Sequence, residues 1–412
     1  MKHKLTTGAG LAVTLALLFS ACSAPNTQAG LVPANAVANV TTQAPTATQA
    51  SAIETFGEKL FNQTLTGNVN AVVSPLSAYT ALGMAYEGAA GTTAQAFQDV
   101  MGMTPADARA TLAYLLTAWQ NDTDGTTVTS ANSAWIDQGF TVKQPWVDTL
   151  KAYYQADVYN LDLQAPGTVG QVNGWISDKT GKLIPSMLDS IDQDVVTLLV
   201  NALYLKADWP QPFDTNDTRE SQFTRADGQT VDAWNMTGSP DGAKHFVTPS
   251  AEGVVLPYKD GRLAFVAAMP TSGNLTLNDG DIASWLAAAK ADDVVVTMPK
   301  FHTEFGVDMT DELSAMGLKV AMTRGAADFS NMTPTEVYIS SVMQKVSMDV
   351  GEKGTVAAAA TVVQFMPTSG QIVATYVVFD HPYVYAVVDQ TTGVPLFIGA
   401  MDDPSQAEPT AK

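Results

Sequence analysis

The sequence predicts an α+β fold in one large domain, in which helices and strands follow one another irregularly. Apolar runs of strand length are interrupted by amphipathic helical stretches at no fixed interval. There is no internal repeat and no regular alternation of strands and helices of the kind that builds a doubly wound parallel sheet. The 412 residues show no linker in their middle, and 46% are hydrophobic, which is enough for one extensive core.

Residues 1–21 are predicted to be a signal peptide. Two lysines give a positive start, and residues 11–19 form an apolar stretch too short to span a membrane comfortably. Cys22 is the sole cysteine, and the preceding residues 18–21 (LFSA) resemble a bacterial lipobox. We therefore expect lipidation of Cys22 in an exported cell-surface or periplasmic lipoprotein. The alternative is cleavage after Ala24, which would give a secreted protein.

Residues 22–50 are rich in Ala, Thr, Pro and Gln and are predicted to be a flexible tether. The folded domain is expected over residues 51–403, and residues 404–412 are predicted to be a disordered tail. The net charge of −20 argues against nucleic acid or anionic lipid as a partner. The lipid on Cys22 would thus be the protein's sole link to a membrane.

Three helices are predicted near the start of the domain. The first covers residues 53–65 and carries apolar side chains on one face. The second begins at Ser74-Pro75, with serine as N-cap and proline in the first turn, and the third begins at Thr104-Pro105. Later helices are expected over residues 144–155, 169–179 and 308–316.

Runs of aliphatic and β-branched residues predict the strands. Residues 194–204 are almost continuously apolar, as is typical of a strand covered on both faces. A second long strand is expected over residues 337–350. Shorter strands are predicted at residues 254–256, 263–269, 294–298, 376–379, 384–388 and 396–398.

The most informative segment is GEKGTVAAAAT at residues 351–361, directly after the second long strand. Loops usually carry polar turn residues and core strands carry bulky ones, so four consecutive alanines fit neither. An alanine-rich helix is the simplest alternative, but two glycines and several β-branched residues frame the run. Small side chains suit a segment that slips between two existing strands without overpacking them.

This segment resembles the proximal hinge of the reactive-centre loop of the serpins, and serpin-like motifs recur in family order across about 350 residues. The motifs are VSPLS (73–77), ALGM (81–84), GAAGTT (88–93), NGWI (173–176), TGKL (180–183), VNALYLKADW (200–209), MPKF (298–301), ADFS (327–330), YIS (338–340), HPY (381–383) and LFIG (396–399). The resemblance implies the serpin fold, in which three β-sheets are surrounded by about eight or nine helices and a reactive-centre loop, here about residues 351–375, is exposed.

The resemblance also implies a suicide-substrate inhibitor of serine endopeptidases, not an enzyme. A target protease would attack the exposed loop and form an acyl-enzyme, and the cleaved hinge would then insert as a new central strand of the main sheet. The expected partner is a serine protease in a covalent complex, and the inhibitor is expected to be a monomer. The sequence contains no HExxH, GxSxG or P-loop motif, so no metal or cofactor is expected.

The family's loop spacing, counted from Gly354, places the scissile bond at Thr368-Ser369. A small residue at position 368 would suit elastase-like or subtilisin-like proteases. A register shifted to the flanking residues would instead favour chymotrypsin-like or cysteine proteases. Trypsin-like targets are disfavoured because residues 362–374 contain no Lys or Arg. The flanking residues that would set specificity are Phe365, Met366 and Pro367.

Matching to the family's motifs assigns the hinge and a charged pair. Glu352 and Lys300 correspond to a pair at the top of the main sheet, near Trp209, that would hold the sheet closed until cleavage. Val356 replaces the family's usual glutamate; if its side chain stays outside after insertion, it exposes some apolar surface without blocking insertion. The hinge residues are Glu352, Gly354, Thr355, Val356, Ala357, Ala358, Ala359, Ala360 and Thr361.

A polar cluster beneath the centre of the main sheet is expected to control strand separation. It comprises Ser74, Ser77 and Asn201, with Gln344 in place of the usual histidine. Glutamine both donates and accepts hydrogen bonds, so it is able to serve in such a cluster. The alternative function is that of a non-inhibitory serpin-fold binding protein or chaperone. The small hinge residues favour inhibition, because bulky, charged or proline residues would stall insertion.

Overall fold

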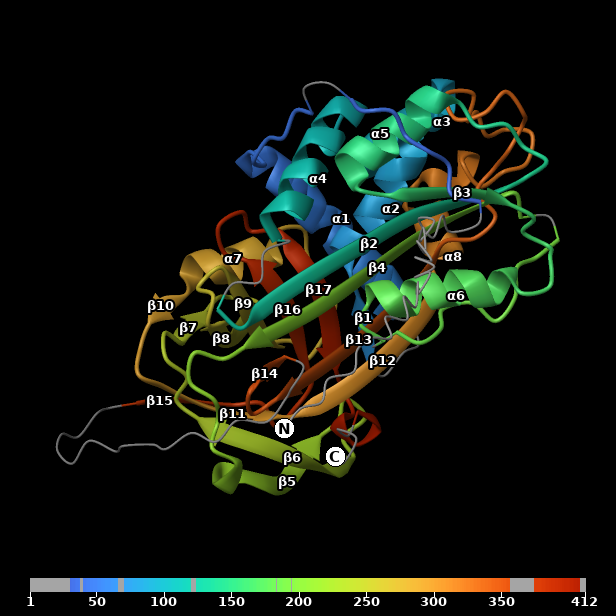
Figure 1. The fold of residues 1–412 in the computed structure, drawn as a ribbon. Coiled ribbons are helices and arrows are strands. Elements are labelled where there is room, and N and C mark those ends of the chain that lie inside the picture. Colours follow the sequence, from blue (N-terminus) through green and yellow to red (C-terminus); the bar gives the residue numbers. More distant parts are fainter. Residues whose placement is uncertain are drawn as a thin grey trace, which may run out of the picture.

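The computed structural model describes residues 30–37, 40–65, 70–119, 124–182, 184–193, 195–355 and 374–407. These residues form eight α-helices and three β-sheets, which confirms the predicted α+β class and architecture (Figure 1). The predicted signal peptide and Cys22 lie outside the described residues. The helices are α1 (Ala47–Leu65), α2 (Pro75–Tyr86), α3 (Gly91–Met101), α4 (Pro105–Trp119), α5 (Gln144–Tyr154), α6 (Thr168–Lys179), α7 (Asp281–Ala288) and α8 (Thr310–Met316).

The largest strands belong to a six-stranded sheet, which we call the main sheet. In spatial order it contains β12 (Phe301–Asp308), β13 (Met343–Gly351), β14 (Gly354–Thr355), β4 (Thr197–Asp208), β2 (Thr126–Asp137) and β3 (Asp157–Leu161). A seven-stranded sheet contains β1 (Ala71–Val73), β17 (Pro395–Met401), β16 (Tyr383–Asp389), β9 (Leu263–Pro270), β8 (Ala251–Pro257), β7 (Lys244–Val247) and β10 (Lys290–Ala291). A four-stranded sheet contains β15 (Thr375–Val378), β11 (Val294–Pro299), β6 (Thr230–Gly238) and β5 (Thr218–Thr224).

Strand β4 is covered on both faces, as its apolar run predicts. Leu203 and Leu205 pack in the large cluster that also contains α2, whereas Val200 and Ala202 pack in a second cluster with α6. Figure 1 shows α6 in front of the main sheet and α2 behind it. The alternation of inward and outward side chains along β4 therefore assigns odd-numbered residues to the α2 side and even-numbered residues to the α6 side.

The second long strand begins later than predicted, at Met343 and not at residue 337. Residues 337–342 have strand-like composition, but their backbone groups bond to a loop and a helix start. The Ile339 amide donates to the Ala321 carbonyl, and the Val342 carbonyl accepts from the Met309 amide. Tertiary hydrogen bonding thus overrides local strand propensity in this stretch.

Residues 30–37 and 40–46 contact the domain, which differs from the flexible tether predicted over residues 22–50. Leu31 forms an antiparallel bridge with Tyr159 of β3, and the Val32 amide donates to the Val158 carbonyl (2.7 Å). The side chain and amide of Asn35 both donate to the Asp148 carboxylate on α5. Helix α1 already begins at Ala47, where residues 46–49 form a capping box. This segment is ordered by backbone pairing to an exposed sheet edge. Amino-acid composition does not indicate such pairing, because almost any residue type can make it.

We expect deletion of residues 1–46 to lower the melting temperature of the uncleaved protein by about 3–6 °C, because the β3 edge and α5 lose these contacts. Deletion of residues 1–29 is the matched control and is expected to leave the melting temperature unchanged. Circular dichroism melting curves of the two truncated proteins and the full chain measure both effects. Equal melting temperatures for all three would show that the segment does not stabilise the domain.

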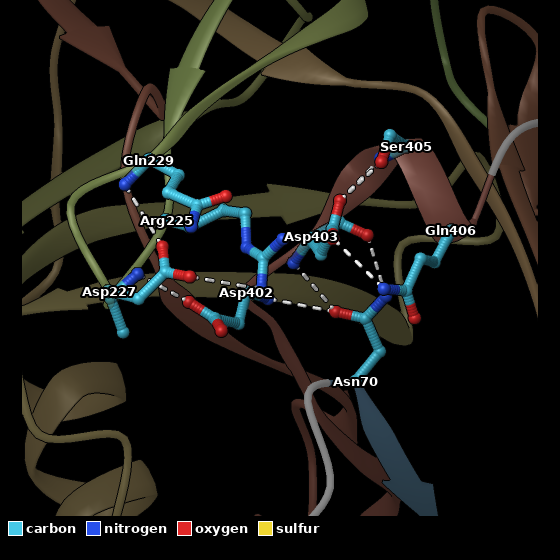
Figure 2. Close-up of polar contacts among 9 residues, drawn as sticks. Asn70, Arg225, Asp227, Gln229, Asp402, Asp403, Ser405 and Gln406 are labelled. Atoms are coloured by element: carbon cyan, nitrogen blue, oxygen red, sulfur yellow. Dashed lines mark hydrogen bonds and ion pairs between the residues drawn. The ribbon is translucent and has the colours of Figure 1, made fainter.

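The predicted disordered tail at residues 404–412 also needs correction, because residues up to 407 are ordered. Pro404–Gln406 form a 3₁₀ turn that Asp403 caps through the Ser405 amide. Figure 2 shows how this turn is fixed: Arg225 pairs with the buried Asp403 carboxylate at 3.1 Å, and Asn70 accepts from the Asp403 amide. These contacts join the C-terminal segment to the β5–β6 turn and to the start of β1.

Among the described residues, no helix is both long and apolar enough to cross a bilayer.

Candidate functional site

The predicted hinge enters the main sheet at β14. Thr355 pairs with Val350 of β13 on one side and with Ala207 of β4 on the other. Gly354 pairs likewise with Gly351 and Asp208. The first two residues of a central strand are therefore already in place.

Gly354 is required by this geometry. Its φ of +149° lies in the region that favours glycine, and a Cβ atom there would lie 2.1 Å from the Ala207 carbonyl oxygen. The three atoms nearest to that Cβ are all backbone atoms of β4, which cannot rotate away. Glycine at this position is therefore what allows β14 to approach β4.

Below Thr355, the edges of β4 and β13 face each other without pairing. The strand pairings among described residues connect each of these strands to β14, and none connects them to each other. We call the region between residues 197–206 of β4 and residues 343–349 of β13 the slot. Each slot edge presents backbone donors and acceptors that a strand entering from β14 would satisfy.

Trp209 closes the top of the slot, where the sequence places it. Its indole nitrogen donates to the Gly351 carbonyl (2.9 Å), and its ring stacks on Tyr258 with centroids 4.7 Å apart. The Tyr258 hydroxyl lies 2.6 Å from the Thr355 hydroxyl, and Thr355 is 1% exposed. Trp209 and Tyr258 together hold the β13–β14 turn, and they show that the Thr355 side chain points into the core.

Glu352 and Lys300 form the predicted charged pair, with Nζ 3.2 Å from the carboxylate. Thr218, which the sequence did not indicate, also donates to this carboxylate at 2.9 Å. Burial alone would raise the pKa of Glu352, but hydrogen bonds from its own amide and from Thr218, together with the Lys300 charge, lower the pKa below its ordinary value of 4.5. The ionised carboxylate is thus favoured in the folded protein.

We expect the Glu352→Gln variant to lower the stability of the uncleaved protein at pH 7 by about 1–2 kcal/mol, because hydrogen bonds to a charged group are lost. A carboxyl group with a depressed pKa stabilises the fold above its unfolded pKa, and this contribution is lost as pH falls through the folded pKa. The wild type should therefore lose its advantage over the variant as pH falls below the ordinary value of 4.5 and through the lower folded pKa. Guanidinium unfolding at pH 7 and pH 3.5 measures this difference; an equal difference at both pH values would contradict it.

The structure brings the residues of the polar cluster together, and their hydrogen bonds tie both slot edges to the first turn of α2. Ser77 donates to the Asn201 side chain, which anchors β4. Gln344 accepts from the Ser74 amide and donates to the Ser74 carbonyl, both at 2.9 Å, which anchors β13. Asn132 of β2 extends the cluster by accepting from Asn201. The glutamine therefore makes a two-point backbone contact.

An apolar hollow lies at the lower end of the slot, next to this cluster. It has about 700 Å³ of space not filled by protein atoms, part of which is open to solvent. Its floor is the small-residue face of α2, and its sides come from β4, β13 and the segment before β13. The principal lining residues are Ala81, Ala85, Leu199, Phe329, Met332 and Val337.

The remaining predicted site residues lie outside the described part of the chain. These are the hinge residues from Val356 to Thr361, the flank Phe365, Met366 and Pro367, and the predicted bond Thr368-Ser369. Tyr258 and Thr218 belong to the site although sequence reasoning missed them. Both lie far from the hinge in sequence and carry no motif. Within the described ranges, no group of three or more His, Cys, Asp or Glu side chains is arranged to hold a metal ion.

Comparison with known proteins decides the family. The family model described as serpin (serine protease inhibitor) matches residues 51–404. The chain belongs to the serpin family. A curated relative from Thermococcus kodakarensis, called an uncharacterised serpin-like protein, is 30% identical over 368 residues, covering 86% of this chain and 85% of the relative. Membership associates this serpin, in general terms, with protease inhibition and not with catalysis.

Solved structures also resemble this serpin. Native tengpin, a thermophilic serpin, is 26% identical with a TM-score of 0.82, covering 90% of this chain and 97% of tengpin. Latent tengpin gives a lower TM-score of 0.75 at 25% identity, covering 87% and 98%. Thyroxine-binding globulin in complex with thyroxine shares the fold at 20% identity, with a TM-score of 0.76 and coverage of 86% and 99%. The serpin fold by itself therefore does not separate inhibitors from binding proteins.

Proposed function

We propose that this serpin inhibits serine endopeptidases by a suicide-substrate mechanism. The observation that carries the proposal is β14, which begins a strand between β4 and β13 while the rest of the slot stays unpaired. The residues that follow Thr355 are small, so they pass between the slot edges without a steric barrier. A protein that only bound a ligand would need neither the strand start at β14 nor small residues after Thr355.

The chemistry is that of an interrupted proteolysis. The protease serine attacks the carbonyl carbon of Thr368, the amine of Ser369 leaves, and an ester joins the protease to Thr368. Water would normally hydrolyse this ester. Insertion of the cleaved hinge moves the attached protease along the main sheet first, so the ester persists. The inhibitor then acts as a monomer in a covalent complex with one protease.

Strand pairing supplies the free energy for this step. Residues entering the slot would exchange hydrogen bonds with water for ladder bonds to both edges. Alanines at positions 357 and 359 share the inward parity of Thr355, and Val356 has the outward parity. After insertion, the valine that departs from the family pattern would therefore lie on the outward face of the new strand, where it would not obstruct entry.

We propose elastase-like or subtilisin-like enzymes as targets, because Thr368 is small and β-branched. The test mixes the purified domain with a pancreatic-type elastase, a subtilisin and chymotrypsin. A band at the summed mass on a denaturing gel, and a new N-terminus at Ser369, are the expected results with one of the first two enzymes. A new N-terminus after Phe365 or Met366 with chymotrypsin would shift the register. Cleavage by all three enzymes without a covalent band would contradict inhibition of these protease classes.

We also propose that the protein is exported and carries a lipid on Cys22. The support is the charged, apolar and lipobox-like pattern of residues 1–22. Metabolic labelling with a radioactive fatty acid, comparing wild type with Cys22→Ser, tests the anchor. Label in the wild type and none in the variant is expected, whereas an unlabelled wild type would favour the secreted form.

A further inference from the structure

We propose that Glu54 and Glu58 of α1 hold one proton between them and form a pH-sensitive clasp on α7, which is closed at acidic and neutral pH and weakens as the pH becomes alkaline. The clasp consists of these two carboxyl groups and the first backbone amides of α7. It concerns how one helix is attached to the domain, so it is independent of protease inhibition.

The clasp supplies the hydrogen-bond acceptors that the first turn of α7 needs. The N-terminal amides of a helix have no carbonyl partner inside the helix, and Gly280, the N-cap of α7, has no side chain to accept from them. Glu58 accepts from the amides of Gly280 (2.7 Å) and Ile282 (3.2 Å). Glu54 accepts from the amide of Ala283 (2.6 Å). Two side chains of α1 therefore replace the capping side chain of another helix.

The two carboxyl groups lie deep inside the protein. The exposed fractions of Glu54 and Glu58 are 3% and 0%. The residues are four positions apart in α1, so they lie on one face of this helix, one turn apart. Next to them, Ile282 and Trp285 of α7 pack into a buried apolar cluster. The carboxyl groups are therefore shielded from water while α7 is in place, and two negative charges so close together would be strongly unfavourable there.

No cation compensates the pair within the described ranges. The charged group that acts on both residues is Asp281, which is itself acidic. Lys59 instead pairs with Asp279 at the surface, at 3.3 Å. Of the elements that pack most closely on α1 and α7, β1 and β17 have no ionisable side chain, and α2, α3, α8 and β7 contribute Tyr79, Tyr86, Asp99, Asp311, Glu312, Lys244 and His245. Neither cationic candidate of β7 forms an ion pair with the clasp, and the ring of His245 pairs with an acidic residue of β8.

The clasp therefore retains a proton at neutral pH. Burial and the neighbouring acidic charges raise the pKa of Glu58 from 4.5 to about 8, although hydrogen bonds from two amides of α7 act in the opposite direction. Burial raises the pKa of Glu54 as well. A carboxyl group with a raised pKa stabilises the closed form fully below 4.5, and this contribution is lost as the pH rises through the folded pKa of about 8. Above that pH, opening the clasp to water would relieve the buried charges.

Hydrogen exchange of the full-length protein at pH 6, 7 and 8 tests the clasp. Mass spectrometry of peptides that cover the start of α7 gives their protection factors, in which the intrinsic pH dependence of exchange is removed. The open form releases one proton in this range, so wild-type protection should fall about 10-fold per pH unit, or roughly 100-fold from pH 6 to pH 8. Asp279→Asn, which removes an exposed carboxylate from the same segment, is the matched control and should show the same fall.

Two variants assign the pH dependence to the pair. Glu58→Gln has no proton to lose, so its protection should change by no more than about 2-fold from pH 6 to pH 8, whatever its absolute level. Glu54→Gln keeps an acceptor for the Ala283 amide but removes the like charge, so the pKa of Glu58 should fall. The loss of protection in this variant should therefore level off at a lower pH than in the wild type. Glu54→Gln alone decides the question if Glu58→Gln does not fold.

Three results would overturn the proposal. Wild-type protection that stays constant from pH 6 to pH 8 would show that both carboxyl groups are ionised throughout. An equal pH dependence in the wild type and in Glu58→Gln would place the titrating group elsewhere. Protection that levels off at the same pH in the wild type and in Glu54→Gln would show that the two residues do not share a proton. None of these results bears on the reactive-centre loop, so the proposed inhibition would stand in each case.

Discussion

The Thr355→Arg variant is expected to turn the inhibitor into a plain substrate of its target protease. Thr355 is 1% exposed, and its hydroxyl lies 2.6 Å from that of Tyr258. A guanidinium group at this point would be desolvated without a partner, at a cost of about 3–5 kcal/mol. The acyl-enzyme partitions between insertion and hydrolysis, so such a cost reduces the yield of covalent complex by roughly 100-fold or more.

The yield is measured on denaturing gels as complex formed per loop cleaved. Val356→Arg is the matched control, because the alternation that buries Thr355 directs residue 356 outward. The control should keep most of its complex, whereas the Thr355 variant should accumulate cleaved, non-covalent product. Undiminished complex in Thr355→Arg would show that the hinge does not enter beneath Trp209.

The Gly354→Ala variant is expected to expel β14 from the main sheet before any protease arrives. The new Cβ would lie 2.1 Å from the Ala207 carbonyl oxygen and 2.7 Å from the Asp208 Cα, so the strand cannot stay where it is. Backbone hydrogen bonds to the top of β4 and β13 would open with it. Amide exchange at these two edges should accelerate by at least about 10-fold, and capture of the protease should slow because insertion must start again from outside.

Gly351→Ala serves as the control for this change. Gly351 lies in the same turn, but a Cβ there meets nothing within 4 Å. Hydrogen exchange followed by mass spectrometry should show the control unchanged and the Gly354 variant altered at β4 and β13. Protection that is identical in both variants would mean that β14 contributes little to the closed sheet.

The sequence predicts well those elements whose own residues carry the signal. The apolar run of β4 and the Ser-Pro start of α2 are such cases, and both are confirmed. Strand β2 was missed because TTVTSANSAWID alternates small and polar residues. Its Asn132 and Ser133 are nevertheless buried, because Asn132 donates to the Tyr154 carbonyl and Ser133 accepts from the Trp135 indole nitrogen. Polar residues that are buried because distant groups satisfy their hydrogen bonds leave no alternating hydrophobic pattern in the sequence.

The same distinction applies to the site. The hinge, Trp209 and the charged pair follow from local motifs, whereas Tyr258 joins them only because β8 and β9 bring their connecting turn under the hinge. The tether was predicted too long because a segment that pairs with a sheet edge through backbone atoms needs no special composition. Contacts between distant elements set these features, and one sequence without its fold does not reveal them.

With the proposed lipid on Cys22, the edge pairing of Leu31 would give the molecule a defined orientation relative to a membrane. Leu31 lies beside Tyr159 of β3, and the pairing of β3 with β2, and of β2 with β4, puts this end level with Leu198. The lipid attachment point and the reactive-centre loop would therefore lie at opposite ends of the domain, with the loop facing away from the bilayer. Residues 22–29 reach at most about 28 Å. If insertion carries the captured enzyme to the membrane-proximal pole as proposed, the anchored domain would have to tilt to make room for it, so each capture would reorient the protein on its surface.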